Sequence, residues 1–201
     1  MTKIKFIYFD VGNVMNEFEG SFDETTNKFN IPQDKFFDFW MEHEDDLTRG
    51  KMTPEQFWKL AIKRFKLQNA EGWNFADSWS NGYSPQLITH ELVKKLYGKH
   101  KIGLITNHYI KMFDLSIKKG MIPDLKYHSI VTSHETGFRK PELEIFEIAT
   151  KRAGVKPSEI LLLDDRPEFI EGAKLFGWQT VWFDMNNKEK AIKEVEKILE
   201  L

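Results

Sequence analysis

IKFIYFDVGN, residues 4–13, is the stretch that decides the fold. Residues 4–9 are apolar on nearly both faces, and Asp10 and then Gly12 follow them. A strand that is buried inside a parallel sheet has this pattern. The stretch therefore predicts a buried strand that ends in a carboxylate. Gly12 lets the chain turn sharply there, so that backbone N–H groups can approach an anion.

The rest of the chain alternates strand-like and helix-like segments. Further strands are expected at residues 102–106, 129–132, 160–163 and 180–183. Helices are expected to begin at Ser84-Pro85, Pro141 and Pro167, with Ser84 as an N-cap, and a last helix is expected over residues 188–201. This alternation predicts an α/β fold with an open, parallel, Rossmann-like sheet.

Residues 16–84 have a different pattern and predict no strand. Thr53-Pro54-Glu55-Gln56 forms a capping box, and an apolar stripe from Phe57 to Phe65 follows it. We therefore expect an all-helical cap over residues 16–84, inserted into a core made of residues 1–15 and 85–201. The aromatic residues of the cap either form the core of a small bundle, the more common role, or line a substrate pocket.

Composition narrows the class of protein. The chain has 201 residues, a net charge of −2 and no cysteine, which excludes disulfides and thiol catalysis. The near-neutral charge gives no general attraction to nucleic acid or to an anionic membrane, and no apolar run approaches the length of a membrane span. We expect a cytoplasmic monomer or homodimer that binds neither nucleic acid nor membrane.

Four polar segments occur where the expected strands end. They supply the carboxylate of Asp10, the hydroxyl of Thr106, the ammonium of Lys140 and the adjacent carboxylates of Asp164 and Asp165. The carboxyl ends of parallel strands meet at one edge of a sheet, so these groups are expected to converge. An aspartate can attack phosphorus, an ammonium can offset the charge of the substrate, and paired carboxylates favour Mg²⁺.

Each residue also has a simpler structural interpretation. Asp10 can start a turn, Thr106 can cap the next helix, Lys140 can be solvated surface, and Asp165 can belong to the start of a helix. The hypothesis of an active site depends on the four segments occurring together, in this order, each at the end of a strand.

The four segments resemble the motifs of the haloacid dehalogenase superfamily of aspartate-nucleophile hydrolases, over about residues 1–15 and 85–185. The helical insertion has the position of the first cap type of that superfamily. Residues 9–14, FDVGNV, are most similar to small bacterial sugar-phosphate phosphatases related to α-glucose-1-phosphate phosphatase, and to the N-terminal domain of soluble epoxide hydrolases. The resemblance implies a Mg²⁺-dependent phosphatase that forms an aspartyl-phosphate intermediate on a small phosphorylated metabolite, such as a sugar phosphate.

The resemblance also implies roles for individual residues. Asp10 would be the nucleophile and a metal ligand, and Asp165, Asp164 and the carbonyl of Gly12 would complete the magnesium site. Thr106 and Lys140 would hold the phosphoryl group. The complete expected phosphate-binding set is Val11, Gly12, Thr106, Asn107 and Lys140.

One departure from the superfamily is important. Most of its phosphatases carry a second aspartate, the general acid and base, where this chain has Gly12. Loss of a general acid costs about 100- to 10,000-fold in rate. Glu17, His43 or His108 can replace it, the substrate can have a good leaving group, or activity can be low. A second departure is Phe169, where relatives often carry asparagine.

Two alternative functions stay open at this point. One is a catalytically weak or inactive binding protein that retains the fold. The other is a metal-free 2-haloacid dehalogenase, which uses the same aspartate against carbon. The pair Asp164 and Asp165 argues against the dehalogenase, because that chemistry needs no metal carboxylates.

Overall fold

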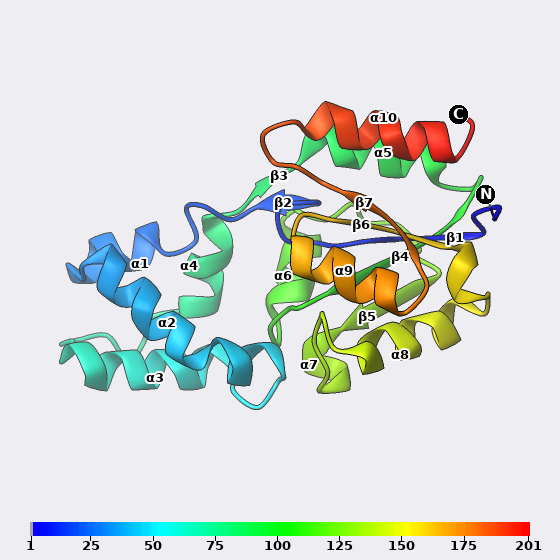
Figure 1. The fold of residues 1–201 in the computed structure, drawn as a ribbon. Helices are drawn as coiled ribbons and strands as arrows, with labels where there is room; N and C mark the ends of the chain where they lie inside the picture. Colours follow the sequence, from blue (N-terminus) through cyan, green and yellow to red (C-terminus); the bar gives the residue numbers. More distant parts are fainter. Residues whose placement is uncertain (1) are drawn as a thin grey trace.

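A computed structural model of the chain describes residues 2–201 and contains a parallel, five-stranded sheet. The strand order is β5-β4-β1-β6-β7, so that the strand predicted from residues 4–9 lies at the centre (Figure 1). The strands are β1 (Phe6–Phe9), β4 (Lys101–Thr106), β5 (Ser129–Thr132), β6 (Ile160–Asp164) and β7 (Gln179–Trp182). The predicted open α/β sheet is confirmed.

Helices cover both faces of this sheet. Successive side chains of a strand point to opposite faces. Ile7 and Phe9 of β1 pack with helices α5 (Leu87–Leu96) and α10 (Lys188–Ile198), which lie side by side on one face (Figure 1). Phe6 and Tyr8 pack with α8 (Leu143–Ala153) and α9 (Pro167–Leu175) on the other. The sheet is therefore the middle layer of three. Because helices cover both of its faces, a functional site must lie at an edge of the sheet or in the loops there.

Gly103 permits the close approach of β4 to its neighbours. A Cβ atom at this position would lie 2.6 Å from the carbonyl oxygen of Ser129 and 2.7 Å from the ring of Tyr8. Contacts this short do not occur between real side chains and backbone, so a larger residue would push the strands apart. Because β4 ends in Thr106, this glycine helps to set the position of that residue.

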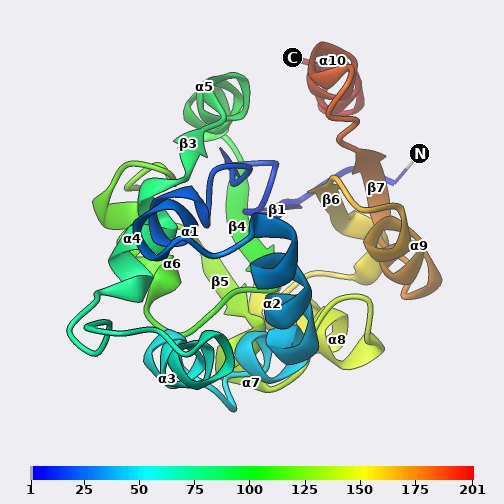
Figure 2. The same cartoon turned by 90° about the vertical axis from the view of Figure 1, so that its left-hand side faces the viewer.

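Residues 18–83 form the helical layer beside the carboxyl end of the sheet (Figures 1 and 2). Its helices are α1 (Asp23–Phe29), α2 (Gln33–Thr48), α3 (Pro54–Phe65) and α4 (Phe75–Asn81). The capping box predicted at Thr53 is present, with reciprocal hydrogen bonds to Gln56. A separate aromatic core that includes Phe36, Phe57 and Phe75 holds these helices together.

The residues on either side of this segment form an antiparallel ribbon that the sequence did not predict. The strands β2 (Asn16–Glu17) and β3 (Ser84–Pro85) pair with each other. The prediction that Ser84 caps a helix is wrong, because Pro85 pairs with Asn16 and the helix begins only at Leu87. The N–H of Gln86 donates to the carbonyl of Met15, which fixes the extended backbone there.

Other helix boundaries also differ from the prediction. Pro141 does not open α8, which begins two residues later at Leu143. The last helix ends at Ile198 rather than at residue 201. Thr106 is not a helix cap, because the next helix, α6 (Met112–Lys118), begins after Lys111. Pro167 begins α9, as predicted, and Gly154 follows the end of α8 with a left-handed backbone.

Two short elements complete the fold, α7 (Ser133–Thr136) and a 3₁₀ turn (Pro157–Glu159). Among residues 2–201, none of the helices is long and apolar enough to span a membrane.

Candidate active site

The structure brings together the residues that the four sequence segments supply. Asp10 directly follows β1, Thr106 is the last residue of β4, and Asp164 is the last residue of β6. Lys140 comes from the loop between α7 and α8. The shared direction of the strands places all of these groups at the edge of the sheet that faces α1–α4.

Lys140 is the centre of a buried charge cluster. Its side chain is 0% exposed, and Nζ lies 2.9 Å from Oδ1 of Asp10 and 2.5 Å from Oδ2 of Asp164. Oδ1 of Asp10 also accepts a hydrogen bond of 2.7 Å from the N–H of Val11. The ammonium and this N–H therefore fix the rotation of the Asp10 carboxylate. The interpretation of Lys140 as solvated surface is excluded.

The electrostatics of the cluster favour a further cation. Burial raises the pKa of Asp164 to about 8, although the charge of Lys140 opposes the rise. Burial, with the negative charge of Asp10, raises the pKa of Asp165 to about 6. Burial also opposes the charge on Lys140, but the two aspartates beside it outweigh burial and raise its pKa. The raised pKa values mean that the three carboxylates resist being ionised together unless a cation joins them; if all three were ionised, the single ammonium of Lys140 would leave two negative charges uncompensated.

The three carboxylates fit a divalent metal ion. One oxygen from each of Asp10, Asp164 and Asp165 lies within 4.8 Å of the other two. Hard oxygen donors of this kind suit Mg²⁺, which binds a few carboxylates and keeps several waters. The charge of Mg²⁺ matches the two uncompensated negative charges. The carbonyl oxygen of Gly12, also expected to be a ligand, accepts a hydrogen bond of 2.7 Å from the N–H of Val14.

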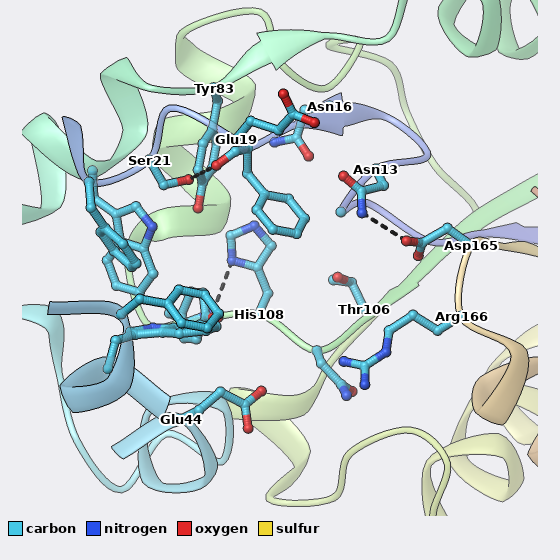
Figure 3. Close-up of a pocket in the computed structure, with 18 of the residues that line it drawn as sticks. Asn13, Asn16, Glu19, Ser21, Glu44, Tyr83, Thr106, His108, Asp165 and Arg166 are labelled. Atoms are coloured by element: carbon cyan, nitrogen blue, oxygen red, sulfur yellow. Dashed lines mark hydrogen bonds between the residues drawn. The ribbon is translucent and has the colours of Figure 1, made fainter. Parts of the chain in front are cut away.

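Two asparagines support the cluster. Nδ2 of Asn13 donates to Oδ2 of Asp165 at 2.8 Å (Figure 3). Asn107 bonds to both backbone groups of Lys140, because its Nδ2 donates to the carbonyl and its Oδ1 accepts from the N–H. Asn13 has a φ of 57°, in the left-handed region that asparagine tolerates better than most residues. No role for Asn13 followed from the sequence, and Asn107 holds Lys140 where a phosphate contact was expected.

Phe169, the second departure noted in the sequence, lies beside Lys140. Its ring lies 4.9 Å from Nζ of Lys140 and 4.7 Å from Cζ of Arg166, measured to the ring centroid. The face of an aromatic ring attracts a cation at these distances. The aromatic ring therefore supports both cations at this edge of the sheet.

A cavity of about 560 Å³ lies above the cluster. Asp10, Gly12, Thr106, Asn107 and Asp165 belong to its lining, whereas Lys140, Val11 and Asp164 lie outside it. Figure 3 shows Thr106, Asp165 and Arg166 on one side of this space, and Glu44, Ser21 and Tyr83 on the opposite side. The lining also includes Asn13, Asn16, Phe18, Glu19 and Glu44, together with α2 residues between 33 and 40, Tyr109 and Phe169. The aromatic side chains of α2 at the cavity agree with the second of the two roles that the sequence left open for the aromatic residues of the cap.

Of the three candidates for a replacement acid, Glu17, His43 and His108, one lines the cavity. Glu17 bonds to Gln86 and Lys188, His43 bonds to the carbonyl of Phe39, and neither lines the cavity. His108 does line it, and its Nδ1 accepts a hydrogen bond of 2.9 Å from the N–H of Tyr109. Nε2 therefore carries the proton of the neutral ring.

Burial, with the charge of His134, lowers the pKa of His108 to about 3. His108 can therefore donate a hydrogen bond at neutral pH but is a poor source of a proton. The space beside Gly12 is also filled, because a Cβ atom there would lie 3.3 Å from the ring of Phe18.

An ion-pair network, here called the clasp, joins α2 to the loop that carries Lys140. Arg139 donates to both carboxylate oxygens of Glu44, at 2.6 and 2.9 Å. Arg49 donates to both oxygens of Glu142, at 3.1 and 2.5 Å, and to Asp45. The clasp ties the helical layer to the residues on either side of Lys140 and Pro141.

The chain was compared with protein families, curated proteins and solved structures. The profile of the family described as haloacid dehalogenase-like hydrolase matches residues 18–183. The glyceraldehyde 3-phosphate phosphatase of Methanocaldococcus jannaschii is 33% identical over 109 residues, which are 50% of this chain and 47% of that protein. Pyrimidine 5′-nucleotidase YjjG of Escherichia coli is 30% identical over 134 residues, 66% of this chain and 57% of that protein.

The chain thus aligns with only about half the length of these curated relatives. Among solved structures, a haloacid dehalogenase-family enzyme of Bacteroides thetaiotaomicron, in complex with magnesium and inorganic phosphate, has a TM-score of 0.73. It is 21% identical, and the match covers 89% of this chain and 93% of that one. The family profile spans most of the chain, the fold agrees, and the strand ends carry the expected groups: the chain belongs to the haloacid dehalogenase-like hydrolases.

Proposed function

We propose that the protein is a Mg²⁺-dependent phosphatase that hydrolyses a small phosphomonoester through an aspartyl-phosphate intermediate. The observation that carries this proposal is the cluster itself: three carboxylates around one buried ammonium, at the floor of a cavity. The names of two relatives, a glyceraldehyde 3-phosphate phosphatase and a pyrimidine 5′-nucleotidase, support a phosphomonoester as substrate.

In this mechanism Asp10 is the nucleophile. Its carboxylate oxygen forms a bond to phosphorus while the bond to the leaving oxygen breaks, and the electron pair departs with that oxygen. Water then attacks the phosphorus of the aspartyl phosphate, which releases inorganic phosphate and restores the carboxylate. Lys140 and the N–H of Val11 hold Asp10 in position through both steps.

Asp10, Asp164 and Asp165 would hold the magnesium ion. When bound, Mg²⁺ neutralises charge on the phosphoryl oxygens in the transition state. Thr106, which lines the cavity, would donate to these oxygens, whereas the amide of Asn107 holds the backbone of Lys140. Lys140 lies beneath the lining, so its geometry supports orientation of Asp10 more directly than contact with phosphate.

The test is hydrolysis of p-nitrophenyl phosphate with Mg²⁺ by the full chain and by Asp10→Asn. Loss of the nucleophile is expected to lower kcat by at least about 1,000-fold. Asp124→Asn, which alters an exposed aspartate outside the cavity lining, is the matched control. EDTA should abolish the activity, and added Mg²⁺ should restore it. Turnover that survives in Asp10→Asn would refute the mechanism.

The dehalogenase alternative predicts a different result. It requires release of chloride from 2-chloropropionate in the presence of EDTA, with no hydrolysis of phosphomonoesters. The pair Asp164 and Asp165 disfavours it, because carboxylates beside Asp10 that no metal ion compensates would repel a 2-haloacid anion.

A further inference from the structure

The wall of the cavity opposite the charge cluster is aromatic. Its rings are Phe22, Phe37, Trp40, Trp79, Tyr83 and Tyr109, whereas Phe18 lines the cavity beside Gly12. A cavity of about 560 Å³ lies within the range of sites that hold ligands of drug size, about 300–1,000 Å³. The cavity therefore has room for a phosphate ester that carries a ring.

Part of the aromatic lining belongs to the core of the helical layer. Trp79 is buried in that core with Phe36, Phe57 and Phe75, and Trp40, Tyr83 and Tyr109 pack against it. Phe37 lies next to Phe36 on α2 but is 49% exposed, and Phe18 is 44% exposed. Large apolar side chains gathered on an accessible surface mark a binding site, because they gain stability only when a ligand covers them.

Three of these rings hold one another in fixed orientations. The centroids of Trp79 and Tyr109 lie 4.6 Å apart. Trp40 meets Tyr109 and Trp79 nearly at right angles, at 74° and 86°, with both centroids 6.4 Å away. Edge-to-face packing of this kind is favourable and restricts rotation of the rings. The cavity therefore presents preformed aromatic surfaces, against which a flat ring can stack or pack by its edge.

The charges of the lining restrict the substrate further. Glu19, Asp34 and Asp38 are exposed carboxylates at the cavity, whereas Arg166 is the one basic residue among the described lining residues. Glu44 also lines the cavity, but Arg139 already neutralises its charge. A second anionic group on the substrate, away from the phosphate, would meet like charges. The lining favours a ring that is neutral or cationic.

We propose that the substrate is a phosphomonoester that carries a planar aromatic ring, neutral or cationic, and that Trp40 and Tyr109 select it. The inference rests on the proposed phosphatase function, with the phosphate group at Asp10 and the ring against α2 and Tyr109. Where the ring itself bears the ester oxygen, the inference also agrees with the absence of a strong acid at Gly12 and His108, since a phenolate leaves without full protonation.

The test measures binding separately from turnover. With Mg²⁺ present, calorimetry compares benzylphosphonate with cyclohexylmethylphosphonate, and 3-phenylpropylphosphonate with 3-cyclohexylpropylphosphonate. Phosphonates are not hydrolysed, and each pair differs only in whether the ring is flat. We expect the aromatic member of at least one pair to bind about 3- to 10-fold more tightly.

Matched variants assign this preference to the cavity wall. Trp40→Leu should bring the ratio of the two affinities close to one. Trp73→Leu is the control, because this tryptophan of the helical layer lies outside the cavity lining and donates to Thr25. A parallel comparison uses 4-(aminomethyl)benzylphosphonate and 4-carboxybenzylphosphonate, of which the cation should bind at least about 10-fold more tightly.

The possible results separate the two proposals. Equal affinities within both pairs, a preference for the saturated rings, tighter binding of the carboxylate or no binding of any phosphonate would overturn the aromatic inference. If p-nitrophenyl phosphate is also hydrolysed, the phosphatase proposal survives that result. Selective binding of aromatic phosphonates without hydrolysis of any phosphomonoester would instead support the cavity assignment and refute the phosphatase.

Discussion

The charge cluster at the sheet edge and the aromatic wall of the cavity depend on different physical interactions. In the cluster, Lys140 must lie within hydrogen-bond distance of two carboxylates, because a buried charge without a partner is strongly unfavourable. The aromatic wall acts through contact area, and neighbouring rings can share the same task. Loss of a single polar atom should therefore disrupt the charge cluster, whereas substitution of one ring in the aromatic wall should weaken ligand binding only in part.

The clasp connects the charge cluster with the aromatic wall. Glu44 lines the cavity from α2, and its partner Arg139 precedes Lys140 in the chain. Variants in the cluster, the wall and the clasp should therefore have effects of different kinds and sizes.

The largest effect is expected for Lys140→Met. Removal of the buried ammonium leaves its aspartate partners unpaired, so the free energy of unfolding without Mg²⁺ should fall by about 3–5 kcal/mol. The rate should fall by about 100- to 1,000-fold, because Asp10 loses its orientation. Urea unfolding and steady-state kinetics measure both effects.

Lys174→Met is the control for this variant. Lys174 pairs with Glu171 on the surface, with side chains 52% and 65% exposed, and should contribute less than about 1 kcal/mol. Equal losses in the two lysine variants would mean that the cluster is no different from a surface ion pair.

The second prediction places a carboxylate where the superfamily has its acid. Gly12→Asp alone should change the rate little, because Phe18 lies 3.3 Å from the new Cβ atom. The double variant Gly12→Asp with Phe18→Ala makes room for the carboxyl group. It should hydrolyse alkyl phosphates about 100-fold faster than the unmodified chain.

Phe18→Ala by itself is the control in those assays. If it gives the same increase as the double variant, the gain comes from space in the cavity and not from a new proton donor.

The third prediction concerns the clasp. Arg139→Ala removes hydrogen bonds to Glu44, and the free energy of unfolding should fall by about 2 kcal/mol. Hydrogen exchange in α2 should become faster, since its link to the core is lost.

Arg152→Ala provides the comparison for that variant. Arg152 pairs with Glu135 at 3.4 Å, with the two side chains 38% and 57% exposed. Faster exchange of α2 in both arginine variants would argue against a specific link through the clasp.

The smallest effect concerns the pH dependence of stability through His108. Burial keeps its pKa at about 3, below the value of about 6.5 in the unfolded chain. As the pH falls below 6.5, the unfolded chain therefore binds a proton that the folded chain does not. The free energy of unfolding should be about 1.4 kcal/mol lower at pH 5.5 than at pH 7.5 from this residue.

Urea unfolding of the wild type and of His108→Asn at both pH values isolates this contribution from that of the other histidines. The variant should lose less stability on acidification. Identical losses in the two proteins would mean that His108 is protonated as readily in the folded chain as in the unfolded one.

The sequence predicted the sheet well because its strands carry a local signal. Residues such as Phe6–Phe9 and Leu161–Leu163 are buried on both faces, so continuous apolar runs mark them. Helix starts next to proline were less reliable. Pro167 begins a helix, but Pro85 joins a ribbon with Asn16, a partner 69 positions earlier in the chain. A proline limits the local backbone, and distant pairing decides between a helix and an extended segment.

The sequence likewise predicted some residues of the candidate site and missed others. Asp10, Thr106, Asp164 and Asp165 were predictable because each follows a buried strand, and parallel strands share one edge. The positions of Asn13 against Asp165 and of Asn107 against Lys140 were not, because these contacts join segments separated by 152 and 33 residues.

The sequence by itself determined the alternation of the sheet strands with helices and the chemical groups at the strand ends. It did so because those features depend on local periodicity and residue type. Only the tertiary structure decided that Phe18 fills the space beside Gly12, that His108 is neutral, and that the rings on α2 and near Tyr109 face the charge cluster. Those features depend on how separate elements pack, and packing brings together side chains that no local pattern relates.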